Sequence, residues 1–596
     1  MTEPVQNVTN ETLESIAANG MWADGLTFTP EVVQVARALL AAVRGVAPAG
    51  ALPPELQQVV DTVRGGAAVE ITQIPGADGV LLSALTVKLN GDEPRPVVVV
   101  PAGWSPLGWL PFVWTYLTLA VDGYHVLAYT PRGLGTPGEI TTSQGFIDVA
   151  GEKDRADGHR VLDYARELFG SGPIGMLGES YGSGLSQLIA ATDPEARVSA
   201  VVALSTWGNL ATSLYDNGTR HLAAMQLLVD FTGGTPGKPE EKFDQDTLRI
   251  LADFEQGVNM EEVVAWGLDR SPETFVELTN SHGIATFMSN TWHETLFPVN
   301  EVLDTFNRLT VPKRLNVWIG NHGAPEAAGL VGIPLGFPFP GLLTPMREAR
   351  DWLDIHLRGI DRDQSEPISD QVMFTYRTQP IVGGAQRITE PARREPAIDW
   401  SQVSTETERW YLGNGGGDGT LLPKPETGWT RSFTVGDGEA AATSATAVAE
   451  FLKTGQRECY GNPQLYRVGD FKRDRLLIWQ TEALTGGRRV RGIPSLHLSV
   501  GSTASAVTLV AYLFDVAPDG TARIITHEPC TLFELVQPEQ RVVRWRLQGA
   551  CYDIPDGHRL ALVVNGYDKL YSYSPPGTTT ITSPEYSESY LDLELG

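Results

Sequence analysis

Short apolar runs that alternate with helical patterns organise the first two thirds of the chain. The runs stand at 80–89, 97–100, 124–129, 174–177, 198–204, 284–288 and 315–319, and helical patterns stand at 156–168 and 346–358. Strands that are apolar along their whole length and alternate with helices are typical of a largely parallel sheet covered on both faces. The pattern therefore predicts an α/β domain formed by residues 67–207 and 284–362.

Residues 1–66, which precede this domain, are expected to be helical. Thr29 is placed to cap a helix that begins with Pro30, and apolar residues then recur at helical spacing as far as Val43. The apolar face of this helix must be buried, either against the main body of the protein or against a second subunit of a homodimer. We favour packing within the chain, because that is the usual fate of an amphipathic helix.

The strand pattern stops between residues 208 and 283. Helical patterns at 222–229, 248–254 and 260–266 surround a loop at 233–239 that is rich in glycine and proline. We interpret this segment as a helical cap inserted into the α/β domain, since such insertions commonly shape the mouth of a pocket.

After a polar linker at 359–367 the chain changes to short strands separated by turn residues. The expected strands are 410–412, 476–480, 496–500, 507–516, 542–547 and 560–564. Many short strands at this spacing are typical of a β-sandwich or jelly roll. Residues 368–596 are accordingly predicted to form an all-β domain.

Composition narrows the possible partners. The 596 residues carry a formal net charge of −27, whereas binding to nucleic acid or to an anionic membrane needs clustered Lys and Arg. The three cysteines, Cys459, Cys530 and Cys551, give neither a disulfide framework nor a paired metal motif. The first residues lack a secretory pattern, and no apolar run is long enough to cross a membrane. These features predict a soluble, cytoplasmic protein.

The pentapeptide at 178–182, Gly-Glu-Ser-Tyr-Gly, is the strongest indication of chemistry. It follows the apolar run at 174–177 and precedes a helical pattern at 183–191. In that setting a G-x-S-x-G sequence forms a sharp turn between strand and helix that exposes the serine hydroxyl. Ser180 is therefore the expected nucleophile.

A serine nucleophile needs a base and an acid that orients the base. In the α/β-hydrolase arrangement the acid and then the histidine follow the serine, each on a loop after a later strand. His322 directly follows the last apolar run and is the expected base. Glu294 follows the run before it and is the expected acid, with Glu301 and Asp304 as alternatives on a helical pattern.

The pair His293 and Glu294 also suggests half of a zinc-binding helix motif. Phe297 occupies the position of the second histidine, so the motif is incomplete. We expect neither a metal nor a cofactor.

Stabilisation of an oxyanion needs two hydrogen-bond donors. The backbone N–H of Tyr181, directly after the nucleophile, is expected to be one. The other should come from the loop after 97–100, where Ala102, Gly103 or Trp104 can donate because Pro101 has no N–H.

Several segments together resemble the X-Pro dipeptidyl-peptidase and cocaine-esterase family of serine hydrolases. The segments are 74–82 (IPGADGVLL), 131–139 (PRGLGTPGE), Asp157 and Gly158 with 178–182 (GESYG), 292–294 (WHE), 321–323 (NHG) and 513–520 (LFDVAPDG). Two positions depart from the family pattern. Glu294 stands in place of the usual aspartate, and the loop after 97–100 lacks the tyrosine whose hydroxyl serves the oxyanion in many members. A backbone amide or the Trp104 indole must act there instead.

The resemblance implies a hydrolase core, a helical cap and a C-terminal jelly roll that together cleave ester or amide bonds through an acyl-enzyme. The leading hypothesis is hydrolysis of a small or medium-sized ester by Ser180, His322 and Glu294. A dipeptidyl-peptidase would need a cap carboxylate for the free amine of its substrate, and the cap acids are Glu240, Glu241 and Asp244. Two further hypotheses are an acyltransferase that uses the same acyl-enzyme and a non-catalytic binding protein.

Overall fold

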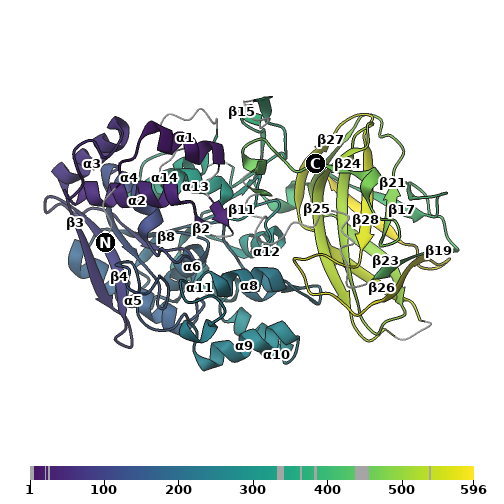
Figure 1. The fold of residues 1–596 in the computed structure, drawn as a ribbon, viewed down its shortest axis with the longest axis horizontal. Coiled ribbons are helices and arrows are strands. Elements are labelled where there is room, and N and C mark those ends of the chain that lie inside the picture. Colours follow the sequence, from purple (N-terminus) through teal and green to yellow (C-terminus); the bar gives the residue numbers. More distant parts are fainter. Residues whose placement is uncertain are drawn as a thin grey trace.

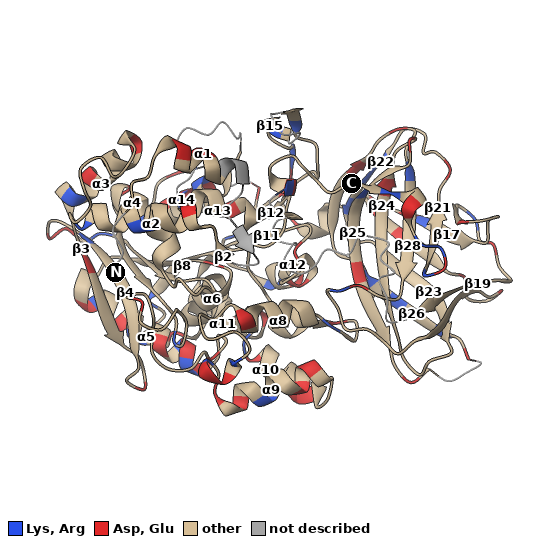
Figure 2. Ribbon diagram, viewed as in Figure 1, with Lys and Arg blue, Asp and Glu red and all other residues tan. Residues whose placement is uncertain are grey.

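The computed structural model describes most of the chain, with an α/β part and an all-β part lying end to end (Figure 1). The described residues are 6–19, 22–24, 27–331, 341–362, 366–380, 386–435, 454–455, 457–535 and 539–596. Asp and Glu are distributed over both parts and are interspersed with Lys and Arg (Figure 2). No helix among these residues is long and apolar enough to cross a membrane.

A ten-stranded sheet forms the centre of the α/β part. The strands, in spatial order, are β16 (Arg394–Ala397), β13 (Ile368–Gln371), β12 (Lys313–Trp318), β11 (Ala285–Thr291), β8 (Val198–Leu204), β7 (Ile174–Glu179), β5 (Val97–Pro101), β6 (His125–Tyr129), β4 (Leu81–Leu89) and β3 (Ala67–Pro75). The seven strands from β13 to β6 run parallel, and the strands at both edges are antiparallel. The predicted, largely parallel α/β sheet is confirmed.

Helices cover both faces of this sheet, and its central strand β5 is accordingly apolar and buried at every residue. Along β5, Val98 and Val100 face one core, while Val97 and Val99 face the other. The first core contains residues of α2 (Pro30–Val43), α3 (Pro54–Gly66), α4 (Val113–Val121), α13 (Ala324–Val331) and α14 (Thr344–Arg358). The second contains residues of α5 (Glu152–Phe169) and α6 (Tyr181–Thr192).

The N-terminal segment is part of the first core. It comprises α1 (Asn10–Asn19), a two-stranded hairpin of β1 (Trp22–Asp24) and β2 (Thr27–Phe28), then α2 and α3. The Thr29 hydroxyl caps α2 by accepting a hydrogen bond from the N–H of Val32 at 3.4 Å. The apolar face of α2 packs on the main body of the chain, as favoured by the sequence.

The segment between β8 and β11 is largely helical, in agreement with the predicted helices. It contains α7 (Leu210–Leu214), α8 (Leu222–Asp230), α9 (Gln245–Gln256), α10 (Met260–Leu268), α11 (Val276–His282) and the short strands β9 (Tyr215–Asp216) and β10 (Thr219–Arg220). Met225, Ile250, Phe254 and Val263 form a small core of their own between α8, α9 and α10.

The C-terminal part is a β-sandwich whose fourteen strands belong to one hydrogen-bonded network. The strands are β17 (Glu406–Gly413), β18 (Gly419–Leu422), β19 (Trp429–Val435), β20 (Tyr466–Arg467), β21 (Leu476–Gln480), β22 (Arg488–Gly492), β23 (Ser495–Ser502), β24 (Val507–Val516), β25 (Thr521–Leu532), β26 (Arg541–Arg546), β27 (Ala550–Ile554), β28 (Arg559–Asn565), β29 (Gly577–Ser583) and β30 (Tyr590–Leu595). A further hairpin joins β14 (Arg377–Pro380) and β15 (Gln386–Glu390). The six strands predicted in this region are all present.

The sandwich and the α/β part share one apolar core. Val302 and Leu303 of α12 (Val299–Arg308) lie in the same cluster as Trp545 and Leu547 of the sandwich. The Asn300 amide also donates to the Leu547 carbonyl at 2.8 Å. Because this core is continuous, the sandwich supports the loop between β11 and α12.

Several strands differ from the sequence-based expectation, among them the β1–β2 hairpin within the segment expected to be helical. Residues 368–371 and 394–397 were placed in the all-β domain, but they form the last two strands, β13 and the edge strand β16, on one side of the α/β sheet. The antiparallel strand β3 was not predicted at all. The assignment of β13 and β16 was wrong because a strand pattern does not say which sheet a strand joins. Strand β3 was missed because it is a half-exposed edge strand without a continuous apolar run.

Candidate active site

Ser180 stands in a strained turn between β7 and α6. Its φ of 54° and ψ of −123° are unusual for a residue other than glycine. The glycines on both sides make the turn possible. A Cβ on Gly178 would lie 2.0 Å from the Gly182 carbonyl oxygen, and a Cβ on Gly182 would lie 2.2 Å from the Pro101 carbonyl oxygen. The geometry is that of a nucleophile elbow.

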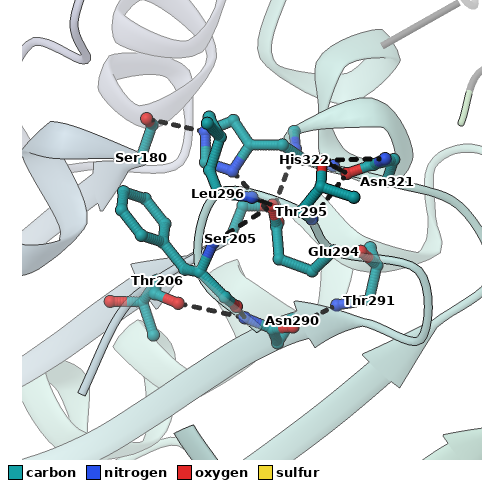
Figure 3. Close-up of polar contacts among 12 residues, drawn as sticks. Ser180, Ser205, Thr206, Asn290, Thr291, Glu294, Thr295, Leu296, Asn321 and His322 are labelled. Atoms are coloured by element: carbon teal, nitrogen blue, oxygen red, sulfur yellow. Dashed lines mark hydrogen bonds and ion pairs between the residues drawn. The ribbon is translucent and has the colours of Figure 1, made fainter. Parts of the chain in front are cut away.

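His322 faces this serine from the loop after β12 (Figure 3). Its Nε2 lies 2.7 Å from Ser180 Oγ, a normal hydrogen-bond distance for proton transfer. The imidazole is almost completely buried, and Phe297 packs edge-on against it with 5.2 Å between the ring centroids. The histidine is therefore held in one orientation beside the hydroxyl.

Glu294 holds the other side of the imidazole. Its Oε2 lies 3.0 Å from His322 Nδ1, while its Oε1 accepts hydrogen bonds from the N–H groups of Leu296 at 2.9 Å and Phe297 at 3.4 Å. Burial alone lowers the pKa of His322, but the charge and hydrogen bond of Glu294 outweigh burial and raise it. Of the three acids considered from the sequence, Glu294 is the one that contacts the histidine.

Glu301 and Asp304, the two acids on α12, have different partners. Glu301 accepts hydrogen bonds from the backbone N–H groups of Gly208 and Asn209 at 2.6 and 2.7 Å. Asp304 forms an exposed ion pair with Arg546 at 2.9 Å. Neither carboxylate is directed at His322.

Asn321 joins the loops that carry the histidine and the acid. Its Oδ1 accepts hydrogen bonds from the N–H groups of His322 at 2.8 Å and Thr295 at 3.2 Å (Figure 3). One amide side chain thus fixes the separation of the two loops.

A second buried carboxylate, Glu326, lies behind the histidine loop and was not anticipated from the sequence. It is on α13 and accepts hydrogen bonds from Ser205 Oγ at 3.0 Å and Ser289 Oγ at 2.6 Å. Burial raises the pKa of Glu326, and these hydroxyls and His322 oppose that shift. The residues come from three separate segments, so no local motif could have revealed the contact.

Two of the expected oxyanion donors already donate hydrogen bonds elsewhere in the structure. The Ala102 N–H donates to the Tyr129 carbonyl at 2.9 Å, because β5 continues its pairing with β6, so this donor was a wrong expectation. The Trp104 indole donates to the Leu228 carbonyl at 2.8 Å and is also engaged. Within the described chain no hydrogen-bond acceptor is found for the backbone N–H of Gly103, Trp104 or Tyr181.

Tyr181, the residue that directly follows the nucleophile, is held in place by the hydrogen bonds of its own side chain. Its hydroxyl donates to Asp154 Oδ2 at 2.6 Å and accepts from the Ala150 N–H at 2.7 Å. Burial, reinforced by the charge of Asp148, raises the pKa of Asp154 to about 7. This buried network fixes the backbone of Tyr181 next to Ser180, and it too was not predicted.

A small, partly open cavity adjoins Ser180. Its walls are formed by Phe28, Gly103, Trp104, Ser105, Gly108, Pro111, Phe112, Glu179 and Ser180. The lining is largely aromatic and apolar, with one carboxylate. Phe28 comes from the N-terminal hairpin, so that segment contributes to the site as well as to the core.

The fold and the site together define a serine hydrolase built on an α/β-hydrolase core. Residues 78–324 match the family profile of X-Pro dipeptidyl-peptidase (S15 family). Residues 368–588 match that of the X-Pro dipeptidyl-peptidase C-terminal non-catalytic domain. The two matches span most of the chain, which belongs to the X-Pro dipeptidyl-peptidase and cocaine-esterase family of serine hydrolases.

Known relatives agree with this assignment. The chain is 24% identical over 500 residues to the cocaine esterase of Rhodococcus sp. (strain MB1 Bresler), covering 75% of this chain and 80% of that protein. An α-amino acid ester hydrolase structure aligns with a TM-score of 0.65 at 15% identity, over 89% of this chain and 97% of that one. A CocE/NonD family hydrolase from Staphylococcus aureus aligns with a TM-score of 0.64 at 12% identity, over 89% and 94%. These structural likenesses show the shared fold.

Proposed function

We propose that the protein hydrolyses a carboxylic ester of small or medium size through an acyl-enzyme on Ser180. As Ser180 Oγ bonds to the ester carbonyl carbon, its proton passes to His322 Nε2, and the same proton then leaves with the departing alcohol. A water molecule, deprotonated by His322, next attacks the acyl carbon and releases the acid and free Ser180.

The observation that carries this proposal is the continuous chain of hydrogen bonds from Ser180 through His322 to Glu294. The distances are 2.7 Å and 3.0 Å. Glu294 selects the tautomer in which Nδ1 carries the hydrogen, which leaves Nε2 free to take the serine proton. The N–H groups of Gly103 and Tyr181 are the donors we assign to the oxyanion.

The cap acids favour ester over dipeptide substrates. Asp244 caps α9 by accepting from the Thr247 N–H at 3.0 Å and pairs with Lys153 at 2.9 Å. Glu241 accepts from the Thr235 N–H at 3.1 Å. Both carboxylates therefore already have partners and are less available to bind the free amine of a dipeptide.

The cavity favours a compact acyl group. Its walls include Trp104 and the rings of Phe28 and Phe112, which pack edge-on with 6.3 Å between centroids. Walls of this kind suit a small apolar acyl group.

A substrate panel tests the proposal. Purified protein would be assayed with p-nitrophenyl esters of increasing acyl length, with aminoacyl esters and with aminoacyl-prolyl amides, each against Ser180→Ala. We expect the highest kcat/KM on a compact ester and none with the variant. Preferential cleavage of the aminoacyl-prolyl amides would contradict the ester assignment in favour of a dipeptidyl-peptidase.

A further inference from the structure

Glu179 lies in the nucleophile elbow but has no role in the proposed reaction. It ends β7, immediately before Ser180, and its side chain is only 8% exposed. The carboxylate lies against Gly103, since a Cβ there would stand 2.9 Å from Glu179 Oε2 and 3.8 Å from Ser180 Cβ. Glu179 and the nucleophile thus flank the same backbone segment, which carries an amide assigned to the oxyanion.

The Glu179 carboxylate also lacks the partners that other buried acids of this protein have. Glu294, Glu301 and Glu326 each accept at least two hydrogen bonds. Across the described ranges, no donor and no cation contacts the side chain of Glu179. It lines the cavity at Ser180 instead. A buried carboxylate without partners is costly while it is ionised.

The charges that face Glu179 add to this cost. They are Glu326 on α13, Glu294 after β11 and His322 after β12. Burial raises the pKa of Glu179 to about 7, the His322 charge opposes this shift, and the two other carboxylates reinforce it. The neighbouring cavity wall contributes Trp104 and Ser105 and no charge. The site therefore favours a proton on Glu179 at and below neutral pH.

Acylation makes the protonation state of this residue important. The attack of Ser180 places negative charge on the substrate carbonyl oxygen, close to the N–H groups of Gly103 and Tyr181. An ionised carboxylate beside them would oppose that charge, whereas a neutral acid offers an O–H donor. Apolar surroundings can keep an acid neutral for this purpose in an enzyme.

We propose that Glu179 acts as a neutral carboxylic acid at the oxyanion site and donates its O–H hydrogen bond to the carbonyl oxygen of the bound ester. This inference rests on the proposed acylation of Ser180. Glu179 keeps its proton throughout, and only its hydrogen bond strengthens as charge develops on the oxygen. Catalysis then needs His322 neutral and Glu179 protonated at the same time.

The pH dependence of kcat/KM on a neutral p-nitrophenyl ester tests this requirement. The wild type should give a bell-shaped profile, falling at low pH as His322 gains a proton and at high pH as Glu179 loses one. Because the two groups interact, both limbs belong to the pair. Glu179→Gln keeps a donor that does not titrate, so it should retain activity at the wild-type optimum to within about fivefold and lose the alkaline limb. Glu179→Ala should fall by about 10²–10³-fold, the usual effect of removing one oxyanion donor.

Two comparisons separate the outcomes. Glu240→Gln, an exposed cap acid, should keep the wild-type profile. Fluorophosphonate labelling of the wild type reports whether Ser180 is a reactive nucleophile, so an unlabelled wild type would refute the proposed function and not this inference specifically. An alkaline limb unchanged in Glu179→Gln would overturn the inference. So would a loss confined to positively charged esters, which would assign Glu179 to cation binding. If Glu179→Gln does not fold, the wild-type profile alone tests the inference. A profile without an alkaline limb near neutral pH would then overturn the inference.

Discussion

His293 and Glu458 form a buried pair, with 3.0 Å between Nδ1 and Oε1, that links the loop carrying Glu294 to the C-terminal half of the chain. His293 Nε2 also lies 3.2 Å from the Ile525 carbonyl oxygen of β25. Both ring nitrogens thus face acceptors, which favours the protonated ring. Burial lowers the pKa of His293, but Glu458 and this carbonyl outweigh it and raise the pKa. His293, which suggested a zinc motif in the sequence, instead connects the loop that carries Glu294 to the sandwich.

This pair predicts a pH-dependent contribution to stability. Because the folded-state pKa of His293 is raised, its contribution is fully present below the ordinary pKa of 6.5 and is lost as pH rises through the folded value. Glu458→Gln should lower the melting temperature more at pH 6 than at pH 9, with about 3–5 kcal/mol lost where the pair is charged. Thermal unfolding at both pH values checks this. An equal loss at both pH values would contradict a stabilising contribution that titrates with His293 between pH 6 and pH 9.

Loss of the acid should leave the fold intact and nearly abolish turnover. Glu294→Gln keeps a similar shape but can fix the wrong tautomer of His322, so kcat should fall by about 10⁴-fold. Steady-state kinetics measure this, with Asp304→Asn as the control, since Asp304 pairs with Arg546 at the surface. Comparable losses in the two variants would exclude a specific role for Glu294.

Glu326 should tune the base without contacting it. Its charge is one of those that raise the pKa of His322. Removing that charge in Glu326→Gln should therefore shift the acid limb of the kcat/KM profile to lower pH. A pH profile of the variant measures the shift. An unmoved or upward-shifted acid limb would contradict this electrostatic role.

Gly103 should tolerate no side chain. An added Cβ would meet Glu179 Oε2 at 2.9 Å, so Gly103→Ala should strain the oxyanion segment by about 1–3 kcal/mol and lower kcat/KM. Gly416→Ala is the matched control, because nothing lies within 4 Å of the Cβ it would add. Kinetics and melting temperatures of both variants test the point, and equal activity in the two would place Gly103 outside the reaction.

The N-terminal hairpin should influence substrate choice. Phe28→Ala removes one aromatic wall of the cavity, so KM for compact esters should rise and longer acyl chains should become relatively better substrates. Val46→Ala serves as the control, since Val46 is 63% exposed in the same segment. Acyl-length profiles of the two variants test this. An unchanged profile in Phe28→Ala would show that the hairpin does not contact substrate.

The sequence predicted the elements that carry strong local patterns. The elbow at Ser180, the parallel strands and the loop positions of His322 and Glu294 follow from apolar runs, glycine spacing and chain order. Glu179 was visible in the same motif, but its lack of a partner depends on packing against Gly103. The contacts of Glu326, and the contact of Tyr181 with Asp154, join segments that are far apart in the sequence. Local periodicity does not encode such contacts. The Ala102 donor was wrong because strand pairing continued one residue further than the apolar run suggested.

Every step proposed for this site depends on acylation of Ser180, which can be observed by trapping the acyl-enzyme. Wild-type protein and the Ser180→Ala and His322→Ala variants would be mixed with an excess of p-nitrophenyl ester, quenched in acid within the first turnover and analysed by intact and peptide mass spectrometry. We expect one acyl group per chain in the wild type, located on Ser180, and none in Ser180→Ala. An adduct on another residue, or turnover by Ser180→Ala at the wild-type rate, would refute acylation at this serine.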